Sequence, residues 1–390
     1  MKKLLLFFFI FTFIANKQLI AITTDFKTNA NTAIVIEATT GKVLFNKDGN
    51  KRIYPASLTK LMTLYIIFDQ LKQNRFKLNT EITISEDAYK KGGGRNGSST
   101  MFLLPNQKVT VEDLIHGIAT VPGNDASIAM AEAIAGSESQ FAHYMNAYAR
   151  KLGLYNSHFI NSTGWPNPNN YTTAHDIAIL SQHLINDFPE YYNFFNVHEF
   201  TFNKITQPNR NSLLFDKSIL VDGLKTGHTT EAGFNLAFSA TNLQGVRIIG
   251  VIDGLKSNNE RTQEGKKLLT WVFFNLGIKT LYKKGDLITT LPIWNGDLSS
   301  LKLYAPTDIN VFYNKSNSNL SDYKVTFTHS NVLIPTIQNG EKVASIKIVN
   351  KNNQEDTYTY KLLSNKNIKL AGFITRFFKT PYYLIKKLFL

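Results

Sequence analysis

The chain has 390 residues, of which 43% are hydrophobic and 18% charged, so it is globular rather than disordered and long enough for two domains. It has no cysteine, which excludes a thiol nucleophile, a thiolate-bound metal and a disulfide framework. The formal net charge is +14. In an exported chain this balance favours contact with anionic lipid or acidic wall polymers over nucleic acid.

The first residues predict export. Two lysines at positions 2 and 3 precede an almost wholly apolar run from Leu4 to Ala15. This run is shorter than the ~20 residues that a membrane-spanning helix needs, and it fits the hydrophobic region of a secretory signal. We expect a signal peptide over residues 1–21, although Leu19 fits the small-residue cleavage rule poorly. A retained N-terminal anchor is the alternative.

Residues 22–276 show the patterns of a mixed α and β domain. Two strands are expected around a Thr-Gly turn within residues 32–46, and adjoining strands at Gly223–Gly227 and within Gly233–Gly254. Apolar residues at helical spacing predict six helices, at Ser57–Leu71, Val111–Thr120, Ala126–Ala135, Glu138–Leu152, 173–185 and Arg261–Asn275.

The periodicity of apolar residues changes in the C-terminal part of the chain. Residues 277–365 alternate at period two, which predicts a small all-β domain, a sandwich. Residues 366–390 predict an amphipathic helix that Pro381 kinks or restarts. Its cationic side is Arg376, Lys379, Lys386 and Lys387, and its apolar side is Phe373, Ile374, Phe377, Phe378, Leu384, Ile385, Leu388 and Phe389. We expect this helix to lie in an anionic lipid interface, with packing against the sandwich as the alternative.

Ser57 and Lys60 stand three residues apart at the start of a predicted helix, so their side chains share a face. The positive end of the helix dipole is a poor place for an ammonium group and a good one for a neutral lysine that takes a proton from a serine. Work near pH 7 requires the lysine pKa to fall by about three pH units from ~10.4. A capping serine beside a solvated lysine is the alternative, because the same spacing also occurs twice in strand-like sequence.

Two further motifs follow this pair. Gly123-Asn124-Asp125 forms a turn between two predicted helices, and Lys225-Thr226-Gly227 heads a strand pattern. Ser-x-x-Lys, an asparagine turn and Lys-Thr-Gly, in that order, are the signature set of penicillin-binding proteins and serine β-lactamases. The sequence around these motifs resembles the low-molecular-mass D-alanyl-D-alanine carboxypeptidases of the penicillin-binding protein 5/6 type, and the resemblance extends over almost the whole chain. The segments that carry it are PASLTKLMT, GNDASIAMAE, NRNSLLF and VDGLKTGHTTEAGFNL.

This resemblance implies an α+β fold. A penicillin-binding/serine β-lactamase-like transpeptidase domain, with an antiparallel sheet flanked by helices, would be followed by the small sandwich and the amphipathic helix. It implies a serine-type enzyme that trims the terminal D-alanine from peptidoglycan stem peptides and binds β-lactam antibiotics covalently. The enzyme would act at the periplasmic face of the bacterial inner membrane, without cofactor, metal or nucleic acid, and its oligomeric state is left open.

The resemblance also implies a role for each site residue. Ser57 would attack the carbonyl between the two D-alanines and carry the acyl group, while Lys60 would take its proton and later activate water. Asn124 would bind the peptide and orient Lys60. The backbone N–H groups of Ser57 and His228 would form the oxyanion hole. The implied substrate-binding residues are Arg210, Lys225, Thr226, Gly227 and His228.

Pro122 departs from the family's pattern, because it stands where the Ser-x-Asn motif has its serine. The proton-relay role of that hydroxyl must fall to water, to Lys60 or to no group at all, and losing such a path commonly costs 10²–10⁴-fold. A non-catalytic penicillin- or wall-binding scaffold is therefore one alternative. A β-lactamase is the other, against which the second domain, the C-terminal anchor and the absence of a deacylating glutamate motif count.

Other motifs give weaker hypotheses. Gly92–Gly97 formally fits G-x-G-x-x-G, but no βαβ pattern surrounds it, so we expect a mobile loop near the site rather than a nucleotide cradle. The eight histidines lack metal-ligand spacing. Thr173-Ala-His-Asp176 is interpreted as a capping box, in which Asp176 serves as a helix cap. Arg261 is interpreted as either a guide for the substrate carboxylate or a member of a surface ion pair.

Overall fold

The computed structural model describes residues 26–93, 98–315, 323–329, 332–351, 354 and 356–377, so the predicted signal peptide lies outside the described part. The helices are η1 (Ala56–Thr59), α1 (Lys60–Lys72), α2 (Glu86–Gly92), α3 (Val111–Ala119), α4 (Asn124–Ala135), α5 (Glu138–Lys151), α6 (Ala174–Asp187), η3 (Tyr192–Asn196), η4 (Ser212–Phe215) and α7 (Asn258–Asn275). The strands of the first part are β1 (Thr32–Glu37), β2 (Val43–Lys47), β3 (Arg52–Ile53), β4 (Glu81–Thr83), β5 (Lys108–Thr110), β6 (Thr172–Thr173), β7 (Glu199–Phe202), β8 (Ile205–Pro208), β9 (Val221–Thr229), β10 (Gly233–Thr241) and β11 (Arg247–Leu255).

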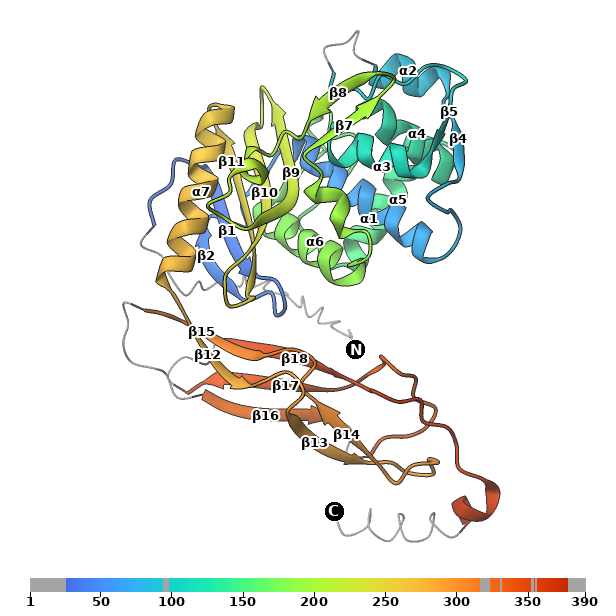
Figure 1. Ribbon diagram of the computed structural model, residues 1–390, viewed down its shortest axis with the longest axis vertical. Coiled ribbons are helices and arrows are strands. Elements are labelled where there is room, and N and C mark those ends of the chain that lie inside the picture. The colour runs from blue at the N-terminus through green and yellow to red at the C-terminus, as the bar shows by residue number, and fades with distance from the viewer. Residues whose placement is uncertain are drawn as a thin grey trace, which may run out of the picture.

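A five-stranded sheet forms the centre of the first part. Its strands run in the order β2-β1-β11-β10-β9, and all four pairings are antiparallel. Helix α7 covers one face, while the helical layer that contains α1 and α6 covers the other (Figure 1). Every residue of β1 is buried, as expected for a strand that is covered on both faces. The predicted antiparallel sheet flanked by helices is therefore confirmed.

Helix α1 lies inside the helical layer rather than on its surface. All of its residues except Asp69 and Lys72 are buried, so the helix is apolar around almost its whole circumference. The predicted helix at 57–71 is present, but it begins as the 3₁₀ turn η1 and becomes α-helical only at Lys60. Ser57 makes no capping hydrogen bond there. The polar end of the helix is thus carried into the protein interior.

Thr173 is the N-cap of α6, in agreement with the predicted Thr173-Ala-His-Asp176 capping box. The Thr173 hydroxyl accepts a hydrogen bond from the backbone N–H of Asp176 at 3.0 Å, which satisfies a free donor of the first turn. The Asp176 carboxylate itself accepts from the Asn156 N–H and from the Ser157 hydroxyl. Asp176 therefore ties the preceding loop to the helix.

The second part is all β, as predicted. Its strands are β12 (Leu276–Tyr282), β13 (Leu287–Pro292), β14 (Ser300–Tyr304), β15 (Ile309–Asn314), β16 (Tyr323–His329), β17 (Lys342–Asn350) and β18 (Thr357–Leu363). They form the sheets β12-β15, β13-β14 and β16-β17-β18, below the first part in Figure 1. Helix α7 continues directly into β12, and Lys42 forms a salt bridge with Asp356 at 2.6 Å. The two parts are therefore connected both by the polypeptide chain and by an ion pair.

Residues 373–377 are helical where the amphipathic helix is predicted. Phe373, Ile374 and Phe377 are 75%, 74% and 66% exposed, so most of the surface of these apolar side chains is accessible to solvent. The remainder of the predicted helix, including Pro381, lies outside the described residues. Within the described part of the chain, no helix is long and apolar enough to cross a membrane.

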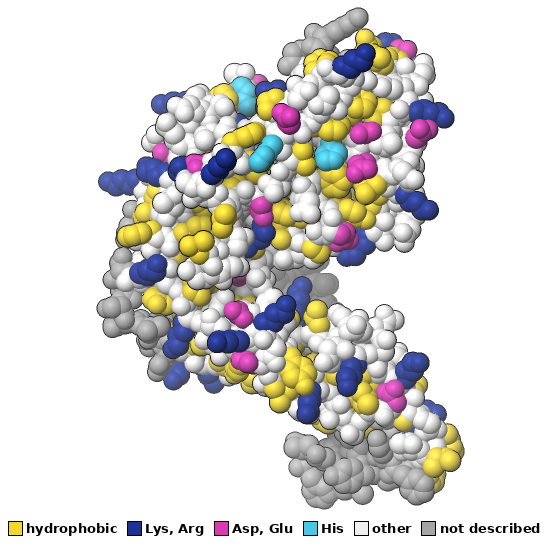
Figure 2. All heavy atoms as spheres, in the orientation of Figure 1, with side chains coloured by type: hydrophobic (Ala, Val, Ile, Leu, Met, Phe, Trp, Pro, Cys, Tyr) yellow, Lys and Arg dark blue, Asp and Glu magenta, His cyan; other side chains and the backbone are white. Residues whose placement is uncertain are grey.

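Basic side chains are spread over the visible face of both parts, with acidic side chains among them (Figure 2). They do not gather into a single stripe on this face.

Candidate active site

The backbone around Ser57 is strained and tightly packed. Ala56 has a φ of +46°, a left-handed conformation that costs an alanine roughly 1–3 kcal/mol. Gly164 passes so close that a Cβ on it would lie 1.8 Å from the Ala56 carbonyl oxygen. Only glycine fits there, and its own φ is +85°. The loop at Gly164 thus holds the turn that presents Ser57.

Lys60 is fully buried directly behind Ser57. Its Nζ lies 3.2 Å from Ser57 Oγ, 2.5 Å from Asn124 Oδ1 and 2.6 Å from the Thr163 carbonyl oxygen. Its side chain is 0% exposed. The alternative of a capping serine beside a solvated lysine is therefore wrong. The sequence analysis did not find Thr163, because a backbone carbonyl that lies 103 positions from Lys60 leaves no motif.

Burial controls the charge state of Lys60. It lowers the pKa of Lys60 from its ordinary value of 10.5 to about 7, although the carboxylates of Glu138 and Asp125 act in the opposite direction. Near neutral pH a large fraction of this side chain is therefore uncharged. A neutral amine 3.2 Å from a hydroxyl can accept its proton, and this is the arrangement that nucleophilic catalysis by serine requires.

Asn124 begins α4 and connects Lys60 to a serine that the sequence analysis missed. Its Nδ2 donates to Ser98 Oγ at 2.5 Å, while its backbone N–H donates to the Ser99 carbonyl at 2.8 Å. The buried Asp125 carboxylate binds the same loop through the Thr100 hydroxyl at 2.7 Å. The only signal for Ser98 was a hydroxyl-rich run after the Gly92–Gly97 segment, whose residues 94–97 lie outside the described part.

The Lys-Thr-Gly triplet lies on β9, the edge strand that packs against η1. Lys225 is 2% exposed and donates to the Thr226 carbonyl at 3.2 Å. Burial, together with the charges of Lys60, Arg261 and Arg210, holds the pKa of Lys225 well below its ordinary value. At Gly227 a Cβ would lie 3.0 Å from the Pro55 carbonyl oxygen, so a side chain here would press on the turn that carries Ser57.

A cavity of about 610 Å³ opens over these groups. It is lined by residues from η1, α4, β9 and α7, among them Ser57, Asn124, Arg210, Thr226, His228 and Arg261. Every predicted site residue is therefore at this cavity or, as with Lys60 and Lys225, buried behind it. Among the residues that the structure describes, no cluster of His, Asp or Glu could hold a metal ion.

Arg261 belongs to the cavity wall rather than to a surface ion pair. It is 6% exposed, and its guanidinium donates to the backbone oxygens of Gly227 at 3.4 Å and Arg210 at 3.3 Å. Burial and the neighbouring Arg210 lower the pKa of Arg261 to about 10. Two arginines beside Lys225 make this end of the cavity attractive to an anion such as a carboxylate.

In a comparison with known proteins, each of the two parts of the chain matches a family model. A family model described as D-alanyl-D-alanine carboxypeptidase matches residues 19–257, and one described as penicillin-binding protein 5, C-terminal domain, matches residues 278–370. The chain is 37% identical to the D-alanyl-D-alanine carboxypeptidase DacA of Haemophilus influenzae, over 92% of this chain and 90% of that protein. It is 40% identical to the Escherichia coli K12 enzyme DacA, over 82% and 79%.

Solved structures show the same likeness in three dimensions. The crystal structure of penicillin-binding protein 5 from Haemophilus influenzae matches with a TM-score of 0.72 and 36% sequence identity. The match covers 89% of this chain and 99% of that one, so it includes the penicillin-binding domain and the all-β domain together.

Proposed function

This chain belongs to the D-alanyl-D-alanine carboxypeptidase family, and from that premise we propose that it removes the terminal D-alanine from peptidoglycan stem peptides as a serine-type enzyme. The observation that carries the proposal is the contact between Ser57 Oγ and the buried Lys60 Nζ at 3.2 Å. Neutral Lys60 takes the Ser57 proton as Oγ attacks the carbonyl between the two D-alanines. The backbone N–H groups of Ser57 and His228 hold the resulting oxyanion.

The same lysine completes the reaction. As an ammonium group it returns the proton to the departing D-alanine nitrogen, which leaves an ester on Ser57 and a neutral Lys60. Water then gives a proton to Lys60 and attacks the ester carbonyl, and that proton finally returns to Ser57 Oγ. Direct transfer by Lys60 replaces the hydroxyl that Pro122 lacks.

Recognition of the substrate's terminal carboxylate falls to the cationic end of the cavity. Thr226 and Arg210 line it, Arg261 supports Arg210 through its backbone oxygen, and Lys225 lies behind it. A β-lactam places its own carboxylate in the same position and acylates Ser57 covalently. An anion bound there also attracts the proton that Lys60 carries, so substrate and base are coupled electrostatically.

The D-alanine release assay tests this function. Wild-type protein is expected to release D-alanine from diacetyl-L-Lys-D-Ala-D-Ala and to gain the mass of benzylpenicillin. Ser57→Ala should reduce both to background, because the nucleophile is gone. Ser299→Ala is the matched control, since Ser299 has the same Ser-x-x-Lys spacing in the second domain, and it should leave both intact.

A stable penicillin adduct without D-alanine release would instead establish the scaffold, the alternative that Pro122 favours. Rapid hydrolysis of penicillin with loss of the adduct would establish a β-lactamase. An adduct that persists in Ser57→Ala would contradict the assignment of the nucleophile.

Ser98 acts as a positioning residue for Lys60. Asn124 uses its oxygen on Lys60 and its nitrogen on Ser98, so the Ser98 hydroxyl holds the amide in the orientation that Lys60 needs. Pro122 has no hydroxyl to share that task. Because Ser98 lines the same cavity as Ser57, its hydroxyl also keeps the approach to Asn124 polar.

Removing this hydroxyl should weaken acylation moderately. A neutral hydrogen bond contributes about 1 kcal/mol, so Ser98→Ala is expected to lower the rate of penicillin acylation about five-fold and to move its pH midpoint. Ser98→Thr retains the hydroxyl and should restore most of the rate. Ser99→Ala, which keeps the backbone carbonyl that binds Asn124, is the control. An unchanged rate and midpoint in Ser98→Ala would remove Ser98 from the mechanism.

The exposed apolar side of residues 373–377 supports peripheral membrane attachment. Three large apolar side chains on one helical turn, in a segment with cations and no acid, suit the interface of an anionic bilayer. Together with the predicted signal peptide, this supports a location at the periplasmic face of the inner membrane.

Deletion of residues 371–390 should release the protein from membranes without affecting the active site. The truncated form is expected in the supernatant after sedimentation with anionic vesicles, while the full chain is in the pellet. Penicillin labelling of both forms is the control for folding. Continued sedimentation of the truncated form would refute the anchor.

A further inference from the structure

The Thr163 carbonyl reaches Lys60 from a loop that follows α5 and that belongs at this point to no helix or strand. Its oxygen lies 2.6 Å from Lys60 Nζ, so a displacement of the loop by about 1 Å would break this hydrogen bond. The next residue, Gly164, packs against Ala56 in the turn that presents Ser57. The position of this loop therefore affects both partners of the reacting pair.

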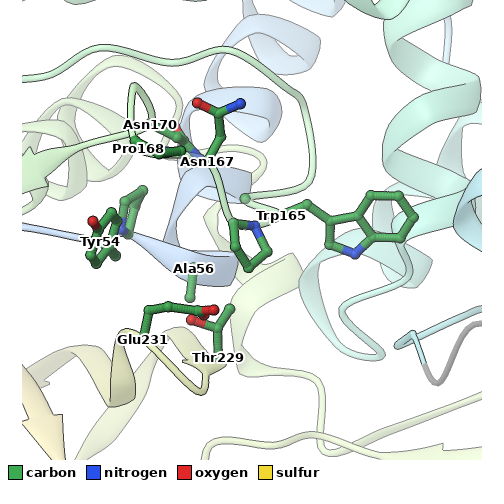
Figure 3. Close-up of a pocket in the computed structure, with 11 residues that line it drawn as sticks. Tyr54, Ala56, Trp165, Asn167, Pro168, Asn170, Thr229 and Glu231 are labelled. Carbon is green, nitrogen blue, oxygen red and sulfur yellow. The ribbon is translucent and has the colours of Figure 1, made fainter.

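Beyond Gly164, a cavity of about 180 Å³ lies between the loop and the turn before Ser57. Trp165 and Pro168 of the loop line this cavity, and Ala56 lines it as well (Figure 3). Atoms that face a cavity lack partners for van der Waals contact on that side. Packing there contributes little to holding the loop, so its hydrogen bonds must do so.

Ser162 is the residue at which these hydrogen bonds meet. It is fully buried, and its backbone N–H and its hydroxyl both donate to Oε1 of Glu138, at 3.0 Å and 2.6 Å. Its carbonyl oxygen accepts from the Thr63 hydroxyl on α1 at 2.7 Å. The residue directly before Thr163 is thus fixed between α5 on one side and α1, the helix of Lys60, on the other.

Glu138 is well suited to this task by its place in the fold. It is the first residue of α5, after the capping Ser137, where the helix dipole favours a negative charge. Hydrogen bonds to a carboxylate are roughly twice as strong as those between neutral groups. The negative charge of Glu138 also lies on the residue that precedes Thr163, which brings it close to the amine of Lys60.

We propose that Glu138 is a positioning residue for Lys60: through Ser162 it holds the Thr163 carbonyl against the amine, and by its charge it favours the protonated amine. The proposal rests on the proposed function, in which neutral Lys60 takes the Ser57 proton. Its two parts make different predictions, because the hydrogen bonds affect the rate and the charge affects its pH dependence.

The charge of Glu138 acts within a balance of charged groups from several elements. Burial lowers the pKa of Lys60 to about 7, against the carboxylates of Glu138 on α5 and Asp125 on α4, which raise it. On β9, burial and the charge of Lys60 lower the pKa of Lys225. Lys91 on α2 is a further cation on which Glu138 acts. Removing the Glu138 charge should therefore lower the pKa of Lys60, so that the neutral amine forms at a lower pH.

The pH dependence of penicillin acylation tests the charge. Glu138→Gln keeps an oxygen that can accept from Ser162 but has no charge. Its acylation midpoint is expected to fall by about half a pH unit, less than the ~1–3 units of a direct ion pair. Relative to its own maximum, the rate at pH 6 should therefore be about three-fold higher than in the wild type.

Two further variants test the hydrogen bonds. Glu138→Ala removes the charge and the acceptor together, so its midpoint should fall as in Glu138→Gln while its maximal rate falls about ten-fold, the larger loss of the two. Ser162→Ala keeps the charge and loses one hydrogen bond. It should lower the maximal rate about five-fold without lowering the midpoint.

Glu86→Gln is the matched control, because Glu86 is also the first residue of a helix, α2, after a capping serine, and its side chain is exposed. It should leave midpoint and maximal rate at their wild-type values. The proposal would be overturned by an unchanged or higher midpoint in Glu138→Gln, by an equal fall in Glu86→Gln, or by a wild-type maximal rate in Glu138→Ala.

Titration of Lys60 by NMR, in the wild type and in Glu138→Gln, measures the same change of midpoint without any reaction. If the wild type releases no D-alanine, the proposed function fails, yet a lower Lys60 midpoint in Glu138→Gln would still support the charge effect. An identical Lys60 midpoint in the two proteins would overturn it.

Discussion

Burial of the Lys60 side chain between Ser57, Asn124 and Thr163 is the constraint on which the rest of the active site depends. Lowering the pKa of a lysine from 10.5 to about 7 corresponds to about 5 kcal/mol of lost preference for the charged form. The fold imposes this by starting α1 at Lys60 and burying that helix on nearly every side. The strained Ala56 and the close approach of Gly164 then fix the serine against the amine.

Basic side chains gather at one end of the cavity beside β9. Arg210 and Arg261 line this end, and Lys225 is buried behind it. In the proposed function, an incoming carboxylate meets the cations. In that proposal, strand β9 would supply the oxyanion donor and also set the direction of the peptide. Departure from the family's pattern at Pro122 leaves this polarity unchanged.

Much of the fold was predictable, because the signals were local. Apolar spacing located the helices from α3 to α7 within a few residues, and the period-two alternation beyond Gly277 identified the all-β domain. Ser57 and Lys60 could be identified only together with the other motifs of the set, because the Ser-x-x-Lys spacing alone also occurs elsewhere in the chain. It was the order of this pair, Asn124 and Lys225-Thr226-Gly227 along the chain that pointed to one cavity.

The remaining site residues were not predictable, because long-range contacts place them. Ser98 meets Asn124 across 26 positions, and the Thr163 carbonyl reaches Lys60 across 103. Neither a loop serine nor a backbone oxygen has a sequence signature. The burial of Arg261 depends on the packing of α7 against β10 and β11. No local sequence pattern predicts this packing either.

Titration of Lys60 itself is the most direct measurement of the central claim. Carbon-13-labelled lysine reports the charge of each ammonium group by NMR, and the spectrum of Lys60→Arg identifies the resonance. The account predicts a midpoint near pH 7 and a penicillin acylation rate that rises through the same midpoint, because only the neutral amine takes the Ser57 proton. The account would be contradicted if Lys60 stayed protonated beyond pH 9 while the acylation rate had already reached its maximum at pH 7.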